Sequence, residues 1–197
     1  MTNDELNGVL DFLRRAEALK STRRSAWTSS GEPETVAAHT WRLCLLALVL
    51  RDELGGADLA RLLSICIVHD LGEAIGGDIP AIHQTPGASK AEQERADLVE
   101  LIEPLPERLR AHVLELWDEY EHAQTREARL AKALDKLETI LQHNQGRNPP
   151  DFDYAFNLDY GRKHTSSLGP LIDALRATLD RETARRAGQA EPDEPGT

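Results

Sequence analysis

The sequence predicts an all-α fold. Apolar residues recur every three to four positions through successive segments, as they do along one face of an amphipathic helix. No segment shows the apolar/polar alternation of a half-buried strand, and there is no internal repeat and no glycine-rich phosphate loop. At 197 residues, the chain is long enough to bury a core around a closed site. We therefore expect one helical domain over residues 1–188 and a disordered acidic tail over 189–197.

Charge and composition exclude several classes of function. The chain has 23 Lys and Arg against 34 Asp and Glu, which gives a formal net charge of −11. We therefore expect no broad electrostatic binding to nucleic acid or to an anionic membrane, and a small anionic substrate would need local cations. No apolar stretch approaches about 18 residues, and the N-terminus has no basic segment followed by an apolar one. The chain is expected to be soluble and cytoplasmic.

The two cysteines indicate a reducing compartment. Cys44 and Cys66 each lie within an apolar helical run, and their spacing is that of neither a zinc knuckle nor a redox pair. We expect both to be buried free thiols.

The first two segments are a helix and a polar loop. Residues 4–20 place apolar side chains on one face and charged ones on the other. Residues 21–31 have no periodicity, but they include Arg23, Arg24 and Trp27. This loop is either a solvated connection with its tryptophan folded onto the core, or a binding loop held by the scaffold.

A second helix is predicted from about residue 32 to residue 54. A proline near its start and acidic residues in the first turn are typical of a helix N-terminus. His39 lies on the apolar face of this helix and is therefore turned inward. Taken alone, such a histidine is either a hydrogen-bonded core residue or a metal ligand.

The third predicted helix, over residues 58–75, ends in the most informative stretch of the chain. Its apolar run stops abruptly at His69 and Asp70. Glu73 follows one helical turn after His69, and two glycines then end the helix so that Asp78 lies in the bend. Burying these groups is costly unless each has a partner, and a divalent cation is one partner that serves them all. The alternative is a surface turn in which the carboxylates are solvated.

The rest of the chain completes the predicted bundle. Its elements are a loop over 81–88, a helix from a capping box at 89–92 to Ile102, a helix near 109–120, a long helix from Thr125 through Leu141 and a last helix over 165–187. Asp135 flanks the buried face of the long helix, where such a residue is ordinarily a solvated ion-pair partner. The loop over 144–153 carries acidic and aromatic residues that could cover a site.

Read together, His39, the adjacent His69 and Asp70, and the distant Asp135 resemble the ligand pattern of the HD-domain metal-dependent phosphohydrolases. Within this superfamily, the chain looks most like the 5'-deoxynucleotidases that act on nucleoside monophosphates. The resemblance covers about residues 6–180. Its specific parts are unlinked segments at 19–27, 33–39, 68–73, 77–79, 116–121 and 134–138.

This resemblance implies a compact single-domain HD-domain helical bundle with one divalent metal ion, which would be Mn, Co, Fe, Zn or Mg. Its ligands would be His39, His69, Asp70 and Asp135. A set of two imidazoles and two carboxylates suits such ions and leaves positions for water and substrate. The implied reaction is hydrolysis of a (deoxy)nucleoside 5'-monophosphate to a nucleoside and phosphate. The resemblance also implies a homodimer.

Other roles follow from the same resemblance. Glu73 and Asp78 would form the acid/base pair around the attacking water, and Arg24 and Trp27 would face the nucleotide. An arginine can neutralise phosphate with planar hydrogen bonds, and a tryptophan offers a flat face to sugar or base. The chain departs from the family pattern at Ala38, where the family generally has an acidic residue before the first histidine.

Two alternatives remain open on the sequence. One is a related phosphohydrolase that acts on another phosphate ester, such as a nucleoside triphosphate, a guanosine polyphosphate or a cyclic nucleotide. The other is a metal-stabilised binding protein without turnover. Ala38 keeps this second alternative open, whereas the presence of both Glu73 and Asp78 argues against it.

Overall fold

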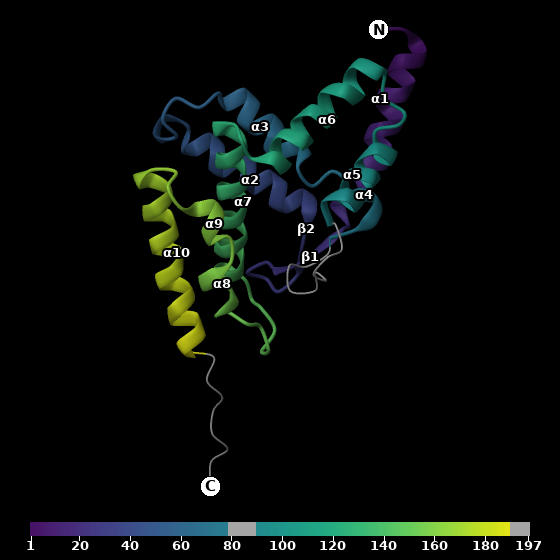
Figure 1. Ribbon diagram of the computed structural model, residues 1–197. Helices are drawn as coiled ribbons and strands as arrows, with labels where there is room; N and C mark the ends of the chain where they lie inside the picture. Colours follow the sequence, from purple (N-terminus) through teal and green to yellow (C-terminus); the bar gives the residue numbers. More distant parts are fainter. Residues whose placement is uncertain (79–89, 190–197) are drawn as a thin grey trace.

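The computed structural model describes residues 1–78 and 90–189, and the described chain is a helical bundle with one small sheet (Figure 1). This confirms the predicted all-α class. The helices are α1 (Asn3–Ala16), α2 (Val36–Val49), α3 (Leu59–Val68), α4 (Glu73–Gly76), α5 (Lys90–Leu101), α6 (Glu107–His122), α7 (Arg126–Gln145), α8 (Phe156–Asp159), α9 (Arg162–Thr165) and α10 (Pro170–Gln189). Two 3₁₀ turns, η1 (Glu17–Lys20) and η2 (Arg51–Glu53), follow α1 and α2.

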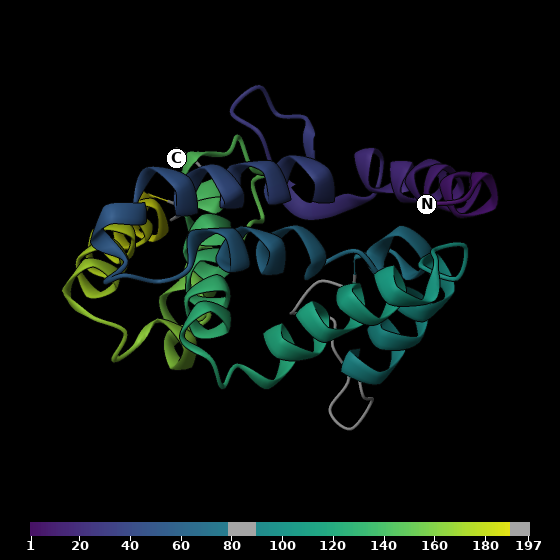
Figure 2. The same cartoon turned by 90° about the horizontal axis from the view of Figure 1, so that it is seen from above.

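Helix α7 is the centre of the bundle. It packs against α2, α3, α6, α9 and α10, and α2 and α3 lie side by side across it (Figure 2). Leucine and isoleucine side chains from these helices are fully buried at the contacts, among them Leu43, Leu62, Ile65, Leu134 and Ile140. The polar residues of α7 that face the same way are therefore held inside the molecule, where they need partners.

The predicted start of the second helix is wrong by a few residues. Pro33–Thr35 is strand β2, which pairs antiparallel with β1 (Arg23–Trp27). The helix begins at Val36, where the Thr35 hydroxyl accepts a hydrogen bond from the Ala38 amide. Two strands this short carry too few residues to show a period, so the sequence pattern missed them.

The third predicted helix is broken, because α3 ends at Val68 and α4 begins at Glu73. The Trp117 indole of α6 donates a hydrogen bond to the His69 carbonyl at 3.1 Å. A Cβ on Gly72 would lie 2.5 Å from the carbonyl oxygen of Glu94, so glycine lets α5 pass close to this turn. His69 and Glu73 are therefore not on one continuous helix, as the spacing had suggested.

The structure agrees only in part with the expectations for the first helix, the last helix and the two cysteines. Helix α1 forms, but its apolar face is largely exposed, with Leu6 at 47% and Leu13 at 56%. The last predicted helix begins later than expected, because Thr165 is the end of α9 and α10 starts at Pro170. Both cysteines are free thiols, and Cys66 is buried as expected, whereas Cys44 is half-buried.

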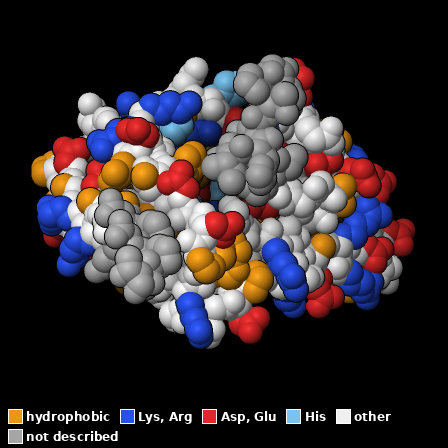
Figure 3. All heavy atoms as spheres, turned by 90° about the horizontal axis from the view of Figure 1, so that it is seen from below, with side chains coloured by type: hydrophobic (Ala, Val, Ile, Leu, Met, Phe, Trp, Pro, Cys, Tyr) orange, Lys and Arg blue, Asp and Glu red, His pale blue; other side chains and the backbone are white. Residues whose placement is uncertain are grey.

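Some predictions lie outside the described residues. They are the loop at 81–88, the first residue of the capping box at 89 and the tail at 190–197. No helix of the described chain is long and apolar enough to cross a membrane. Figure 3 shows acidic, basic and apolar side chains interspersed over the lower face, without a continuous basic patch among its described residues.

Candidate active site

A pocket of about 710 Å³ opens beside α7, between β1, the α3–α4 turn, α5 and the segment from 149 to 164. Seven of the eight residues predicted to form a site line it: Arg24, Trp27, His69, Asp70, Glu73, Asp78 and Asp135. The eighth, His39, is completely buried behind the wall, with its ring in contact with that of His69. The fold thus brings together residues from β1, α2, α4 and α7, from the turn between α3 and α4, and from the residues just after α4.

The two histidines present their Nε2 atoms to the same point. His69 Nδ1 donates a hydrogen bond to the Cys66 carbonyl at 2.8 Å, and His39 Nδ1 is bonded to the carboxylate of Glu138. Since a carbonyl and a carboxylate can each only accept, both Nδ1 atoms carry hydrogen. Both Nε2 atoms are buried without a hydrogen-bond partner. This is the arrangement in which a histidine is oriented for metal binding.

Two carboxylates face these Nε2 atoms. Asp135 Oδ1 lies 3.2 Å from His39 Nε2 and 4.0 Å from His69 Nε2. Asp70 Oδ2 lies 3.1 Å from His69 Nε2 and 3.9 Å from His39 Nε2. Atoms that are each about 2.1 Å from a shared ion lie roughly 3–4 Å apart, so the donor set fits a divalent cation. His39, His69 and Asp70 also meet the spacing of a metal-binding group on their own.

Asp135 is held in place by groups around it. Its Oδ2 accepts hydrogen bonds from the Tyr120 hydroxyl at 2.7 Å and from Lys136 Nζ at 2.8 Å. Burial opposes the charge of this carboxylate, but Lys136 and the two histidines outweigh burial and hold its pKa well below the ordinary value. Asp135 is therefore a buried anion, and the expectation of a solvated ion pair on the helix surface is wrong for this position.

Glu138 orients the other end of His39. Besides its bond to His39 Nδ1, it accepts a hydrogen bond from Arg42 Nε at 2.6 Å. Burial and Arg24 lower the pKa of His39, but Glu138 and Asp135 outweigh them and raise it to about 9. Cation binding at Nε2 would consequently displace a proton. Glu138 supplies a carboxylate to this histidine although Ala38 precedes it.

Arg24 is built into the wall of the site. Its guanidinium donates to Asp70 Oδ2 at 3.3 Å and to the Thr139 hydroxyl at 3.1 Å, and its Nε lies 3.5 Å from Glu34 Oε2. Its side chain is 12% exposed, whereas the neighbouring Arg23 is exposed. Arg24 therefore fixes the orientation of Asp70 and places a positive charge beside it.

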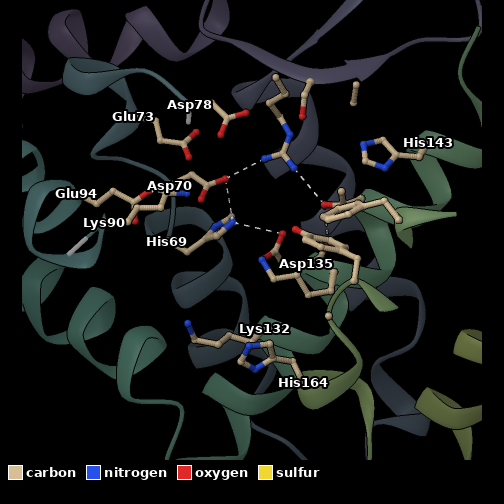
Figure 4. Close-up of a pocket in the computed structure, with 18 of the residues that line it drawn as sticks. His69, Asp70, Glu73, Asp78, Lys90, Glu94, Lys132, Asp135, His143 and His164 are labelled. Atoms are coloured by element: carbon tan, nitrogen blue, oxygen red, sulfur yellow. Dashed lines mark hydrogen bonds and ion pairs between the residues drawn. The ribbon is translucent and has the colours of Figure 1, made fainter. Parts of the chain in front are cut away.

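Asp70, Glu73 and Asp78 form the acid side of the pocket, and Figure 4 shows the Glu73 and Asp78 carboxylates close together on one side of Asp70. Burial, followed by the negative charges of Asp70 and Asp78, raises the pKa of Glu73 to about 10. Burial also raises the pKa of Asp78, and Arg24 counteracts this. A carboxyl with so high a pKa holds its proton near neutral pH, which is typical of groups that transfer protons.

An aromatic wall faces the acid side. Trp27 meets Phe152 edge to face at a centroid distance of 6.2 Å, and Phe152 in turn contacts His143. Pro149, Asp151 and Phe152 line the pocket, so the loop predicted at 144–153 does contribute to its surface.

Several residues of the site have no signal in the sequence pattern. Glu138, Thr139 and Tyr120 each contact a predicted site residue, yet each looks like an ordinary helical residue. Tyr120 lies in a segment that resembles the family, and Glu138 follows Asp135 by three positions on one helical face. That spacing is the one local sign that Glu138 could reach the same site.

Known proteins are similar to this chain in both fold and sequence. A solved structure from Magnetospirillum magnetotacticum MS-1, a predicted metal-dependent phosphohydrolase, superposes with a TM-score of 0.77 at 26% identity and covers 93% of this chain and 97% of its own. The human 5'-deoxynucleotidase HDDC2 is 32% identical over 190 residues, which is 93% of this chain and 91% of the human protein. The Xenopus laevis protein of the same name is 35% identical and covers 85% of each chain.

The HD domain family model matches residues 16–171. This range carries β1, α2, α3, α4 and α7, and with them every side chain of the site. The chain therefore belongs to the HD domain family, as its histidine and aspartate pattern had indicated.

Proposed function

We propose that the protein is a metal-dependent phosphomonoesterase that hydrolyses (deoxy)nucleoside 5'-monophosphates to a nucleoside and phosphate. The observation that carries this proposal is the convergence of two unpartnered histidine Nε2 atoms on Asp70 and Asp135, next to the acid side of a deep pocket. Relatives that match most of this chain are named 5'-deoxynucleotidases, which supports the same reaction class.

His39, His69, Asp70 and Asp135 would hold one divalent cation, whose identity among Mn, Co, Fe, Zn and Mg is open. When bound, the cation would polarise a phosphoryl oxygen, lower the pKa of nearby water and favour the ionised form of the carboxylates around it. Glu138, Tyr120 and Arg24 keep these ligands in one orientation through their hydrogen bonds. Metal ligands oriented in this way bind more tightly than free side chains.

Glu73 and Asp78 are the proposed acid/base pair. Glu73 Oε2 is buried and has no hydrogen-bond partner among the described residues, so it is available to a water molecule in the pocket. Glu73 is protonated near neutral pH without a cation, and a bound cation would favour its ionised form, which can take the proton of the attacking water. Asp78, whose pKa is raised by burial, would donate a proton to the leaving 5'-oxygen. The proton balance of the hydrolysis is then met by two groups on the same side of the pocket.

Trp27 and Arg24 are the proposed substrate-facing residues of β1. Trp27 lies in the aromatic wall, where its ring can pack against the sugar or the base. Arg24 adds positive charge next to the phosphoryl position, while its own donors hold Asp70 and Thr139. The nucleoside would then lie along the aromatic wall, with its phosphate directed toward the histidines.

Three further aspects belong to the same proposal. The protein would act in the cytoplasm, on a small nucleotide, and without a nucleic acid or membrane partner. It would also form a homodimer. The net charge of −11 supports the small-molecule substrate, because binding then depends on local cations inside one pocket.

A phosphate-release assay tests the function. The purified protein, stripped of metal with EDTA, would be given each divalent cation in turn with deoxy- and ribonucleoside 5'-monophosphates, a nucleoside triphosphate, a cyclic nucleotide and an aryl phosphate. We expect metal-dependent release from the monophosphates, faster than from the other esters. Release that is independent of metal, or confined to a triphosphate or cyclic ester, would overturn the proposal.

A further inference from the structure

The lysines of this chain are concentrated in the pocket. The sequence has five lysines among its 23 basic residues, and four of the five line the pocket: Lys90, Lys132, Lys136 and Lys163. The remaining basic residues are arginines. A lysine ammonium is a compact point charge on a flexible stem, and in phosphate sites it binds as such. Lysine at these four positions therefore provides the pocket with compact positive charges of the kind that bind phosphate.

Two of these lysines form a row on α7. Lys132 and Lys136 are four residues apart and so lie on one face of the helix. Lys136 Nζ donates to Asp135 Oδ2 at 2.8 Å, and Lys132 Nζ lies 3.0 Å from Glu121 and 4.2 Å from the centre of the Tyr120 ring. The row therefore begins at a proposed metal ligand and runs away from it along the pocket.

Helix α9, which packs on α7, adds Lys163 and His164 to these lysines. Gly161 precedes it with a φ of +69°, and a Cβ there would lie 2.6 Å from the Cβ of Lys136, so glycine allows α9 to pack tightly on α7. Lys163 is exposed and has no ion-pair partner among the described residues. Figure 4 shows His164 next to Lys132, on the side of Asp135 away from Glu73 and Asp78.

His164 responds to this concentration of positive charge. Burial, followed by Lys132, Lys163 and Lys136, lowers its pKa to about 4, so its ring is neutral near pH 7. A neutral imidazole among three ammonium groups can still donate one hydrogen bond to an anion.

The other cations of the described wall are less suited to a phosphate dianion. Arg24 already directs two of its nitrogens to Asp70 and Thr139. Lys90 is ion-paired with Glu94 at 2.9 Å, as Lys132 and Lys136 are with Glu121 and Asp135, but it lies on the acid side. A dianion placed there would also meet the negative charge of Asp70, which disfavours it.

We propose that Lys132, Lys136, Lys163 and His164, called the lysine side of the pocket, form the subsite that binds the phosphate group of the substrate. The phosphate dianion lies between the lysine row and the paired histidines, with Lys163 and His164 at its outer edge. This inference rests on the proposed function for the identity of the ester, but inorganic phosphate, the product, should bind to the same groups by itself.

Calorimetric titration with inorganic phosphate tests the subsite directly. The full chain with added Mg²⁺ would be compared with Lys132→Met and Lys163→Met, and with Lys90→Met and Lys20→Met as matched controls. Lys20 is the lysine outside the pocket. Loss of one charge-assisted hydrogen bond should weaken phosphate binding about tenfold or more in the first two variants. The two controls should stay within about twofold of the unchanged protein, since neither contacts the subsite. Equal weakening by Lys90→Met, or no weakening by Lys132→Met and Lys163→Met, would overturn the proposal.

A second measurement does not depend on any variant folding. Phosphate added to the unchanged protein at pH 7 should shift the imidazole NMR signals of His164. The signals of the exposed His112 and His122, which lie outside the pocket, should stay in place. Phosphate binding that leaves the His164 signals unmoved would place the anion elsewhere and refute the assignment.

These outcomes are separable from those of the proposed function. Nucleotide hydrolysis with phosphate affinity unchanged in Lys132→Met and Lys163→Met would refute the lysine subsite and leave the function standing. Lysine-dependent phosphate binding without nucleotide hydrolysis would support the lysine subsite and refute the proposed function.

Discussion

The acid side and the lysine side of one pocket both hold protons near neutral pH, but a carboxyl group that does so is uncharged and an ammonium group is charged. On the acid side, burial with the charges of Asp70 and Asp78 raises the pKa of Glu73 to about 10, so its uncharged form is favoured. On the lysine side, Lys136 stays charged against Asp135, whose own pKa is held well below the ordinary value. Like charges crowded on the acid side favour a protonated carboxyl, which suits proton transfer, whereas the pairing of Lys136 with Asp135 keeps the ammonium charged, which suits anion binding. One cavity can therefore keep the two tasks apart.

The two sides also differ in construction. The acid side comes from nine consecutive positions around the break between α3 and α4, which the Trp117 hydrogen bond to the His69 carbonyl holds. The lysine side needs α7 and α9, which are brought together at Gly161. A substitution that damages one side can therefore leave the other intact, and the predictions below use that separation.

The largest effect is expected at His69, a proposed metal ligand that belongs to neither side. His69→Ala removes one of the two unpartnered Nε2 atoms, so the protein should lose its bound metal and at least roughly 10³-fold in turnover. Metal analysis of the purified variant, with His112→Ala as the surface control, is the measurement. Full metal occupancy in the variant would show that the ligand set is assigned wrongly.

Glu73→Gln should separate the acid side from metal binding. Its removal as a proton acceptor is expected to lower turnover by roughly 10²–10⁴-fold, while the metal content stays unchanged. Glu94→Gln, a second carboxylate of the pocket that is paired with Lys90, should lower turnover much less. Unchanged turnover in Glu73→Gln with the metal retained would exclude the role in proton transfer.

Arg24→Ala tests the residue that touches the acid side from β1. Loss of its hydrogen bonds to Asp70 and Thr139 and of its charge should cost about 2–5 kcal/mol in transition-state binding, measured as kcat/KM. Arg23→Ala should cost much less, because Arg23 is exposed. A substrate-facing loop should affect a deoxynucleotide more than an aryl phosphate. Small and equal effects of both changes on both substrates would mean that β1 has no role in substrate recognition.

Glu138→Gln should have an intermediate effect on metal binding, through His39. Removing the carboxylate charge at Nδ1 is expected to weaken metal affinity by about 10–100-fold. Titration of the apoprotein with Zn²⁺ measures this, and Glu127→Gln on the same helix, which bonds to the Asp58 amide, is the control. Equal metal affinity in the two variants would remove Glu138 from the list of orienting residues.

The acid side should also affect stability against pH, apart from any effect on activity. Glu73 has a pKa of about 10 in the fold and an ordinary value of 4.5. The folded state therefore keeps a proton that the unfolded state releases, and stability falls as pH rises between these values. Across the three units from pH 6 to pH 9 this loss is about 4 kcal/mol, so in EDTA the Tm should fall by about 8–16 °C more for the unchanged protein than for Glu73→Gln. Parallel curves for the two proteins would contradict the buried, protonated state of Glu73.

Much of the fold and part of the site could be predicted from local pattern. The apolar period predicted α2, α3, α6 and α7, and His39 was predicted to face inward because it shares the apolar face of α2. The sequence order of His39, His69, Asp70 and Asp135 was enough to indicate the family, and the family model confirms it. The individual roles of the site residues stay predictions.

The break after Val68, the β1–β2 pairing, the Glu138 bond to His39 and the lysine side were decided by the tertiary structure. Three of the four depend on a partner far along the chain: Trp117 for the His69 carbonyl, α2 for Glu138, and α9 for the row on α7. The two strands are close in sequence, but they are too short to show a period. Periodicity reports which face of a helix is apolar, and that is a property of neighbouring residues. The burial of a charge and the identity of its partner are set by how helices pack against one another, so no local pattern could have placed His39 and Glu138 at the two ends of one buried hydrogen bond.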